Sequence, residues 1–381
     1  MMSFLDFPVE KSTIWTELYC ITFYLLILFG NWKSAITRPF SKNVRNQYKK
    51  FVIFSVGFAI VTFCTLGDFY HMMMHLHSKG FTEDSTNFGV EYVYGVIGAL
   101  VGKNYFLFRL IIFGGAYAVY CKTAKRFSID PYYAAIYIYI AHVILFSYAR
   151  ATLAMALYYW GLSFICEPSK KMKWLGYVFG LILIVFCRVF HTSSIVMIVS
   201  TLAILIPLRK WSIIILLVSI PSVAIIFKDY FESFVESGVA DDYLANKFDR
   251  YVDRESSVGI ARIIIDTFSY ASFYIPLFFS TTAIFFKNKY SKIPNSILRL
   301  YKVTFMLMFV SATFLFFGET FYTFYYRVLY MSMIPLTILI LRLYKENYMS
   351  RQALFLCVAP GVPYMIIRTL YCIYLGNLGI Q

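Results

Sequence analysis

Several arginines of this 381-residue chain stand at the ends of long apolar runs, where a charged side chain is costly unless it is paired or solvated. Arg150 lies between two such runs with almost no loop to separate them. Arg188 and His191 are three residues apart at the end of another run, a spacing that would place both on one helical face. A planar guanidinium binds phosphate oxygens in pairs, and a histidine can take a proton from a hydroxyl near neutral pH. These residue types together predict a lipid-linked phosphate substrate and a hydroxyl nucleophile.

Acidic and aromatic residues accompany these cations. Glu319 and Arg327 flank an aromatic run that includes Tyr322 and Tyr326. Tyrosine rings have flat apolar faces and polar tips, which suit sugar rings as well as membrane interfaces. Four further candidates lie in the two longest segments between apolar runs: Asp68, His71, Glu91 and Arg262.

Each of these signals has a structural alternative. A boundary arginine can be an anchor whose stem lies in the apolar layer, and tyrosines are enriched at every membrane interface. His71, His75 and His77 are separated by methionines and have no carboxylate at a fixed spacing, so no metal site is predicted. His142 lies inside an apolar run and is expected to be a hydrogen-bonded structural residue.

The elements that must position these residues are membrane helices. The chain is 60% hydrophobic and 14% charged, whereas soluble domains carry about a quarter charged residues. Apolar runs of about 16 to 20 residues, each bounded by charged residues, are typical of spanning helices. We therefore predict an all-α, polytopic integral membrane protein, a single transmembrane domain over residues 1–381 with about 12 transmembrane helices. The predicted spans are approximately 13–30, 51–67, 104–121, 131–147, 151–166, 174–190, 192–207, 211–227, 264–286, 303–318, 328–341 and 352–372.

The net charge of +15 is unevenly distributed between the loops. Alternate loops hold 22 of the 35 basic residues, which makes them cytoplasmic by the positive-inside rule. Both chain ends and the candidate charged residues then lie on the non-cytoplasmic side. These residues would surround a cavity open to that side, which we call the outer mouth. Mid-span positions are nearly free of charge. The basic excess therefore indicates topology and no nucleic-acid partner. The basic loops are 33–50, 122–126, 170–173, 209–210, 287–302 and 342–351.

Two segments on the non-cytoplasmic side, 68–103 and 228–262, are longer than a connection requires, and long loops are commonly functional. Within the first, the short apolar stretch 89–102 is predicted to be a re-entrant or interfacial helix. In the second, apolar residues at helical spacing predict an amphipathic helix over the outer mouth, with a solvated loop as the alternative. The seven cysteines fall in or at the ends of apolar runs, as buried hydrophobic residues do.

Four fragments share this predicted side of the membrane. They are Asp68-Phe69-Tyr70, Glu91-Tyr92-Val93-Tyr94, Arg150-Ala151-Thr152-Leu153-Ala154 and His191-Thr192-Ser193-Ser194. In their order and spacing, between about Asp68 and Pro207, they resemble the EpsG-type branch of the Wzy polysaccharide polymerases. Beyond Pro207 the resemblance is one of topology.

The resemblance implies a GT-C-like fold with one larger periplasmic loop, in the bacterial inner membrane. It implies a metal-independent glycosyltransferase, without cofactor, for O-antigen, capsule or exopolysaccharide. An oligosaccharide on undecaprenyl pyrophosphate would be transferred at the periplasmic face to a sugar hydroxyl of another lipid-linked repeat unit. Membrane lipid and a chain-length regulator protein are the other expected partners.

The same resemblance implies roles for the candidate residues. Arg150 and Arg188, with Arg262 or Arg327, would stabilise the leaving pyrophosphate. His191 would be the base for the acceptor hydroxyl, with Glu91 as the alternative. The remaining substrate-binding candidates are Asp68, Glu319, Tyr322 and Tyr326.

Two other function classes stay open. A flippase for the same lipid-linked oligosaccharide would have a cationic lumen through the membrane, whereas the candidate charges gather at one mouth. A membrane O-acyltransferase acting on glycans would need an acyl-donor site reached from the cytoplasm, for which His142 is the one mid-span histidine.

Overall fold

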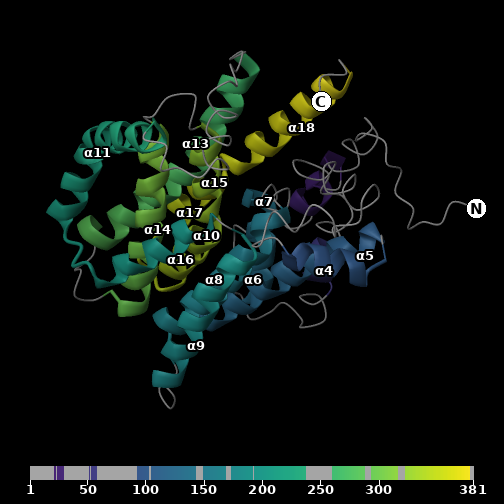
Figure 1. Cartoon of the computed structure of the whole chain (residues 1–381), viewed down its shortest axis with the longest axis horizontal. Helices are drawn as coiled ribbons and strands as arrows, with labels where there is room; N and C mark the ends of the chain where they lie inside the picture. Colours follow the sequence, from purple (N-terminus) through teal and green to yellow (C-terminus); the bar gives the residue numbers. More distant parts are fainter. Residues whose placement is uncertain are drawn as a thin grey trace, which may run out of the picture.

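The computed structural model describes most of the chain from residue 92 onward and two short stretches before it. The described residues are 21, 22, 24–29, 51, 53–57, 92–102, 104–142, 149–168, 173–191, 193–236, 260–287, 293–315 and 322–377. Every regular element in these ranges is a helix, and none of them forms a strand, which confirms the all-α prediction (Figure 1).

The helices follow the predicted apolar runs closely. In chain order they are α4 (Tyr92–Leu100), α5 (Tyr105–Arg109), the π-helix η2 (Leu110–Gly114), α6 (Gly115–Arg126), α7 (Pro131–His142), α8 (Ala149–Cys166), α9 (Lys173–Phe186), the 3-10 helix η4 (Cys187–Val189), α10 (Ser194–Thr201), the 3-10 helix η5 (Leu202–Leu205), α11 (Lys210–Glu236), α13 (Ile260–Thr282), the π-helix η6 (Ala283–Lys287), α14 (Asn295–Leu315), α15 (Tyr322–Met331), α16 (Met333–Lys345), α17 (Arg351–Val358) and α18 (Gly361–Asn377). In the described ranges, each predicted span between residues 104 and 372 overlaps one helix or consecutive helices.

Within the described ranges, four continuous helical segments are long and apolar enough to cross a membrane. They are Leu107–Arg126, Ile263–Phe286, Asn295–Leu315 and Tyr325–Lys345. Shorter apolar helices cover Ala151–Cys166, Ser194–Leu205 and Lys210–Ile226. The chain is thus a multi-pass membrane protein, while the total of twelve spans stays a prediction.

The two long segments between spans are described in part. The nine residues of α4 measure about 14 Å, too short to cross the roughly 30 Å apolar layer alone. That it is interfacial or re-entrant stays a prediction. Helix α11 continues to Glu236, past the predicted span end at residue 227, and α13 begins at Ile260. Residues 237–259 lie outside the described part, as do 68–91.

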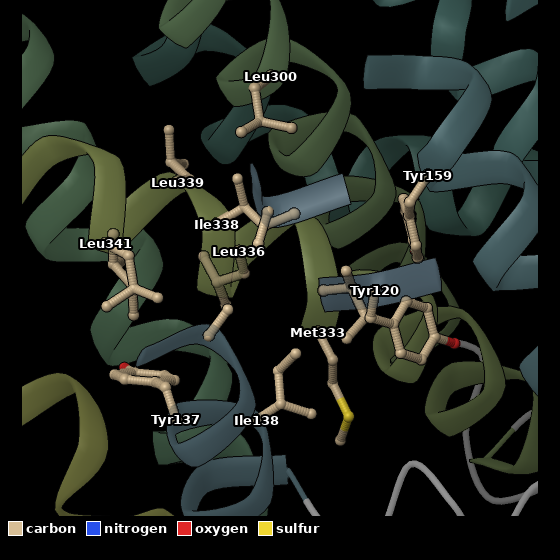
Figure 2. Packing of buried hydrophobic residues seen from close by; sticks show 14 of the residues in the cluster. Tyr120, Tyr137, Ile138, Tyr159, Leu300, Met333, Leu336, Ile338, Leu339 and Leu341 are labelled. Carbon is tan, nitrogen blue, oxygen red and sulfur yellow. The ribbon is translucent and has the colours of Figure 1, made fainter. Parts of the chain in front are cut away.

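Helix α16 forms the centre of the bundle. All residues from Met333 to Leu341 are buried, as expected of a helix that is apolar on every side. Figure 2 shows Leu336, Ile338 and Leu339 between Leu300 of α14 and Tyr137 and Ile138 of α7. Lipid tails are as apolar as these side chains, so close packing, and not exclusion of water, holds α16 in place.

Helices α8 and α9 approach each other unusually closely at the lower edge of Figure 1. A Cβ atom added to Gly161 would lie 2.7 Å from the carbonyl oxygen of Gly180, and one added to Gly180 would meet the Gly161 carbonyl at the same distance. Gly176 and Gly180 form a GxxxG motif, which lets backbones touch in membranes. This contact fixes the register of the α8–α9 pair.

One end of the bundle carries a charged network. Arg342 pairs with Glu346, Nε to Oε1 at 2.8 Å, and reaches Glu167 at 3.5 Å. Arg126 donates to the Glu167 carbonyl oxygen at 3.1 Å. We call this end, with Arg126, Glu167, Arg299, Lys302, Arg342, Lys345 and Glu346, the Arg342 end.

The cations of the Arg342 end cap the carboxyl ends of neighbouring helices. Arg299 Nη1 donates to the Ile165 carbonyl oxygen at 2.8 Å, at the end of α8. Lys302 Nζ donates to the Ile204 carbonyl oxygen at 3.1 Å, at the end of η5. Arg342 and Lys345 donate to the carbonyl oxygens of Phe127 and Ser128, just beyond α6. Because the last carbonyls of a helix have no intrahelical donor, these contacts satisfy groups that would otherwise be unpaired.

Candidate functional site

Helix α14 shows which helix ends lie opposite the Arg342 end. Near its start, Arg299 and Lys302 contact the carboxyl ends of α8 and η5. Near its other end, Ser311 Oγ donates to the Tyr325 carbonyl oxygen of α15 at 3.0 Å. The amino ends of α8, α10 and α15 therefore lie together at the opposite end of the bundle, which we call the His191 end.

The register of α8 and α9 brings two predicted site residues to one depth. Arg150 precedes Gly161 by eleven residues and His191 follows Gly180 by eleven, and these glycines touch in an antiparallel pair. At about 1.5 Å per helical residue, Arg150 and His191 then lie at nearly the same level. The backbone of Arg150 alone is described, in the first turn of α8.

Helix α10 brings hydroxyl groups to the same level. Tyr158 of α8 hydrogen-bonds Thr201 of α10 at 2.8 Å, so these two parallel helices are offset by 43 residues and Arg150 is level with Ser193. Ser194 Oγ donates to the His191 carbonyl oxygen at 2.6 Å, which ties the turn before α10 to its first residue. His191 itself is buried, with 9% of its surface exposed.

Arg188 and His191 do not share a helical face, contrary to the prediction. The α-helical part of α9 ends at Phe186 and tightens into η4, and His191 lies beyond it in the turn before α10. Arg188 is consequently exposed while His191 is buried. Helical backbone ends at Val189, so the relation between residues three apart on a helix does not extend to His191.

Helix amino ends favour anions at the His191 end. Both α8 and α10 direct their positive dipole ends there, and backbone N–H groups of a first turn can bind phosphate oxygens. Arg150 in that first turn opposes the dipole of α8, so it does not stabilise the isolated helix. An anionic ligand would be attracted both by the helix dipoles and by the charge of Arg150.

A second group, in which Tyr326 is the predicted site residue, lies where α13 and α15 meet. Tyr326 donates a hydrogen bond from its Oη to Asp266 Oδ1 at 2.6 Å. The Tyr326 ring stacks on Tyr270 with centroids 6.1 Å apart, and Tyr270 meets Tyr325 edge-on at 5.3 Å. We call Asp266, Tyr270, Tyr325 and Tyr326 the tyrosine cluster. The tyrosine cluster lies at the His191 end, because the Tyr325 carbonyl oxygen accepts a hydrogen bond from Ser311 near the end of α14.

The sequence model of the EpsG family matches residues 51–374. The chain belongs to the EpsG family. This Wzy-like family of polysaccharide polymerases is the one that the four fragments resemble, so the resemblance is confirmed and extends well beyond Pro207. No curated protein and no solved structure matches the chain significantly.

The EpsG-family chain also holds charged residues that sequence reasoning missed. Arg109 and Arg368 lie inside predicted spans, so the spans are less free of charge than expected, and Asp266 lies near the start of another span. Arg109 is 2% exposed, and its guanidinium carbon lies 4.7 Å from the Phe113 ring centroid. A lone charge in an apolar run is itself a functional signal, and it could have identified these positions.

Arg109 lies close to the level of Arg150. The Lys122 ammonium sits over the Trp160 ring at 4.6 Å, an offset of 38 residues between the parallel helices α6 and α8. The same offset places Arg150 level with residue 112, one turn from Arg109.

The other predicted site residues of this EpsG-family protein are described less completely. Arg327 is partly exposed next to Tyr326. Arg262 and Tyr322 lie in the first turns of α13 and α15, and their backbones alone are described. Asp68, Glu91 and Glu319 lie outside the described residues, as do His71, His75 and His77. Within the described ranges no three His, Cys, Asp or Glu residues are grouped as metal ligands.

Proposed function

We propose that this EpsG-family protein is a metal-independent polymerase that transfers an undecaprenyl-pyrophosphate-linked glycan to a sugar hydroxyl of another lipid-linked repeat unit. The observation that carries the proposal is that Arg150 and His191 lie at one level, at the amino ends of α8 and α10. This arrangement supports one anion site beside one proton acceptor.

The proposed orientation places the reaction at the periplasmic face of the bacterial inner membrane. The Arg342 end is built from cations of loops 122–126, 287–302 and 342–351, which the positive-inside rule assigns to the cytoplasm. The His191 end then faces the periplasm. The 18 residues of α8 measure about 27 Å, so its first turn reaches the outer boundary of the apolar layer.

The negative charge of the leaving pyrophosphate would be stabilised by guanidinium groups and helix dipoles. As the acceptor oxygen attacks the anomeric carbon, the bond between that carbon and the pyrophosphate oxygen breaks, and its electron pair stays on the pyrophosphate. Arg150 would stabilise this charge together with the first turn of α8. Arg188, exposed at the same end, and Arg262 or Arg327 are the further candidates.

The acceptor hydroxyl must lose its proton as it attacks. His191 is proposed to take it, since a neutral imidazole is a suitable base near neutral pH and Ser194 fixes the adjoining turn. Glu91 is the alternative base. Asp68, Glu319, Tyr322 and Tyr326 are proposed to bind the glycan.

The test is polymerisation by the purified protein of a purified lipid-linked repeat unit. We expect a ladder of lengthening glycans and released undecaprenyl pyrophosphate. A strain without the protein should display single repeat units on its surface. A strain that exports no glycan, together with no polymer in vitro, would contradict the proposal and favour the flippase.

A further inference from the structure

We propose that Asp266, Tyr270 and Tyr326 form a carbohydrate subsite that binds a sugar ring of the repeat unit by its hydroxyl groups and its apolar face. The inference rests on the proposed function and adds Asp266 and Tyr270 to its substrate-binding residues. It concerns the sugar and not the pyrophosphate, because a carboxylate repels that anion.

The polar part of the subsite is the Asp266 carboxylate. Its Oδ1 accepts a hydrogen bond from Tyr326 Oη at 2.6 Å, which joins α13 to α15. A carboxylate offers about four acceptor positions, so Asp266 can hold Tyr326 and still accept hydrogen bonds from sugar hydroxyls. Hydrogen bonds to a charged acceptor are stronger than those between neutral groups.

The apolar part is the pair of rings beside this carboxylate. Tyr270 follows Asp266 by one helical turn and stacks on Tyr326, with 23° between the ring planes. Asp266, Tyr270 and Tyr326 are all partly exposed, while Tyr325 beneath them is fully buried. The open side of the tyrosine cluster thus combines a carboxylate with aromatic faces, the combination that recognises a hydroxyl-bearing ring.

The support beneath the subsite is rigid. Tyr325 contacts Tyr270 edge-on with an angle of 81° between the planes. One turn below Tyr326, Tyr330 hydrogen-bonds Tyr364 of α18 at 2.9 Å, and Arg368 donates to the same Tyr364 hydroxyl at 3.0 Å. Because three helices hold these rings, a bound sugar would not have to order them first.

The experiment measures binding of the free oligosaccharide, released by mild acid from the lipid-linked glycan of the cells that make the protein. Purified protein in detergent is titrated with this probe by calorimetry. We expect Asp266→Asn, which keeps the size of the side chain, to raise the Kd about tenfold. Tyr270→Leu should weaken binding to a similar degree while it leaves the carboxylate in place.

Tyr348→Phe is the control, since it removes a tyrosine hydroxyl just beyond α16, at the Arg342 end and away from the tyrosine cluster. It should leave the Kd unchanged, and the Tm of Asp266→Asn should stay near that of the parent. Unchanged binding in both Asp266→Asn and Tyr270→Leu would overturn the subsite. If all three variants lost binding affinity and Tm to the same degree, the subsite would also be overturned, because the cluster would then have a structural role.

Polymerisation by the same samples separates this inference from the proposed function. If the parent forms polymer and the variants bind the oligosaccharide as tightly as the parent, the result overturns the subsite and leaves the proposed polymerase unaffected. Oligosaccharide binding that depends on Asp266, in a parent protein that forms no polymer, supports the subsite and contradicts the polymerase.

Discussion

Arg150 occupies a position that helix stability alone does not favour. A cation in a first turn opposes the helix dipole, an effect of about 0.3 to 1 kcal/mol at exposed sites. Arginine anchors at membrane boundaries need no particular partner, whereas Arg150 is level with His191 and with the start of α10. The proposed pyrophosphate ligand would account for both the unfavourable placement and the convergence.

Replacement of Arg150 by lysine tests whether a planar guanidinium is needed. Arg150→Lys keeps the positive charge but loses the paired hydrogen bonds to pyrophosphate, so the polymerisation rate should fall by roughly a hundredfold at equal protein in the membrane. Glycan ladders on gels and initial rates in vitro measure this. Arg351→Lys, an exposed arginine at the start of α17, is the control and should leave the rate unchanged. A normal ladder from Arg150→Lys would remove bidentate pyrophosphate binding from the mechanism.

Removal of the His191 imidazole tests the proposed proton transfer. The parent rate should rise with pH and level off once a histidine is neutral, whereas the lower rate of His191→Ala should continue to rise as the acceptor hydroxyl loses its proton more readily. Initial rates between pH 5.5 and 9 measure this. Parallel pH profiles for parent and variant would transfer the role of base to Glu91. In the combined variant with Arg150→Lys the losses should be less than additive, since both groups act in one transition state.

At the scale of elements, the contact between α8 and α9 sets the position of His191. Gly161→Ala would place a methyl group 2.7 Å from a backbone oxygen and 3.0 Å from Leu183 Cβ, so the two helices must separate. We expect a loss of about 1 to 3 kcal/mol in stability and shorter glycan chains, because α9 leads through η4 to the turn that holds His191. Thermal unfolding in detergent and glycan ladders measure the two effects.

Gly176→Ala is the matched control for this contact. It lies one turn from Gly180 on the same helix, and the nearest atom to an added Cβ, the Phe164 carbonyl oxygen, is 4.0 Å away. Both substitutions gain the same helix propensity, so their difference isolates the close contact. Equal Tm values for the two variants would contradict the packing argument.

Hydropathy predicted the elements well because burial in a membrane needs long apolar helices. The helices between residues 104 and 372 follow the predicted runs, and Cys121, Cys166, Cys187 and Cys357 are buried and free as expected. The local breaks were not predictable from apolar content: Val189 and Phe190 continue the apolar run after Arg188, yet helical backbone ends at Val189 and leaves His191 in a turn.

Contacts between distant segments could not be predicted from one sequence. Asp266 and Tyr326 are 60 residues apart, and no periodicity relates α13 to α15. The fragments that resemble the EpsG family identified Arg150 and His191 as candidates, but their common level depends on Gly161 meeting Gly180. The side of the membrane stays a prediction, which rests on the loop charges alone.

At the scale of the whole molecule, the predicted topology places residue 237 outside and residue 291 in the cytoplasm. Single cysteines at these positions, Ser237→Cys and Ser291→Cys, in a variant with the seven native cysteines replaced by alanine, can be labelled by a reagent that does not cross membranes. The first should react in intact cells, and the second after permeabilisation alone. Labelling of residue 291 but not residue 237 in intact cells would invert the topology and place the His191 end in the cytoplasm.

Independence from metal follows from the proposal that guanidinium groups meet the pyrophosphate charge. Polymerisation by the purified protein should therefore continue at the parent rate after EDTA treatment and gel filtration. A rate that falls to background and returns with added magnesium or manganese would show that a divalent ion carries part of this role.

The capped helix ends at the Arg342 end have a consequence for biogenesis. Arg299 and Ile165 are 134 residues apart in the chain, and Arg342 and Phe127 are 215 apart. In the predicted topology these basic residues hold their loops on the cytoplasmic side during synthesis, and the same side chains later close helices that were inserted long before them. Neutralising these residues would thus have two effects. Some segments would insert with the wrong orientation, and in the molecules that insert correctly the carboxyl ends of α6 and α8 would fray. Quality-control proteases would encounter two kinds of defective chain from a single substitution.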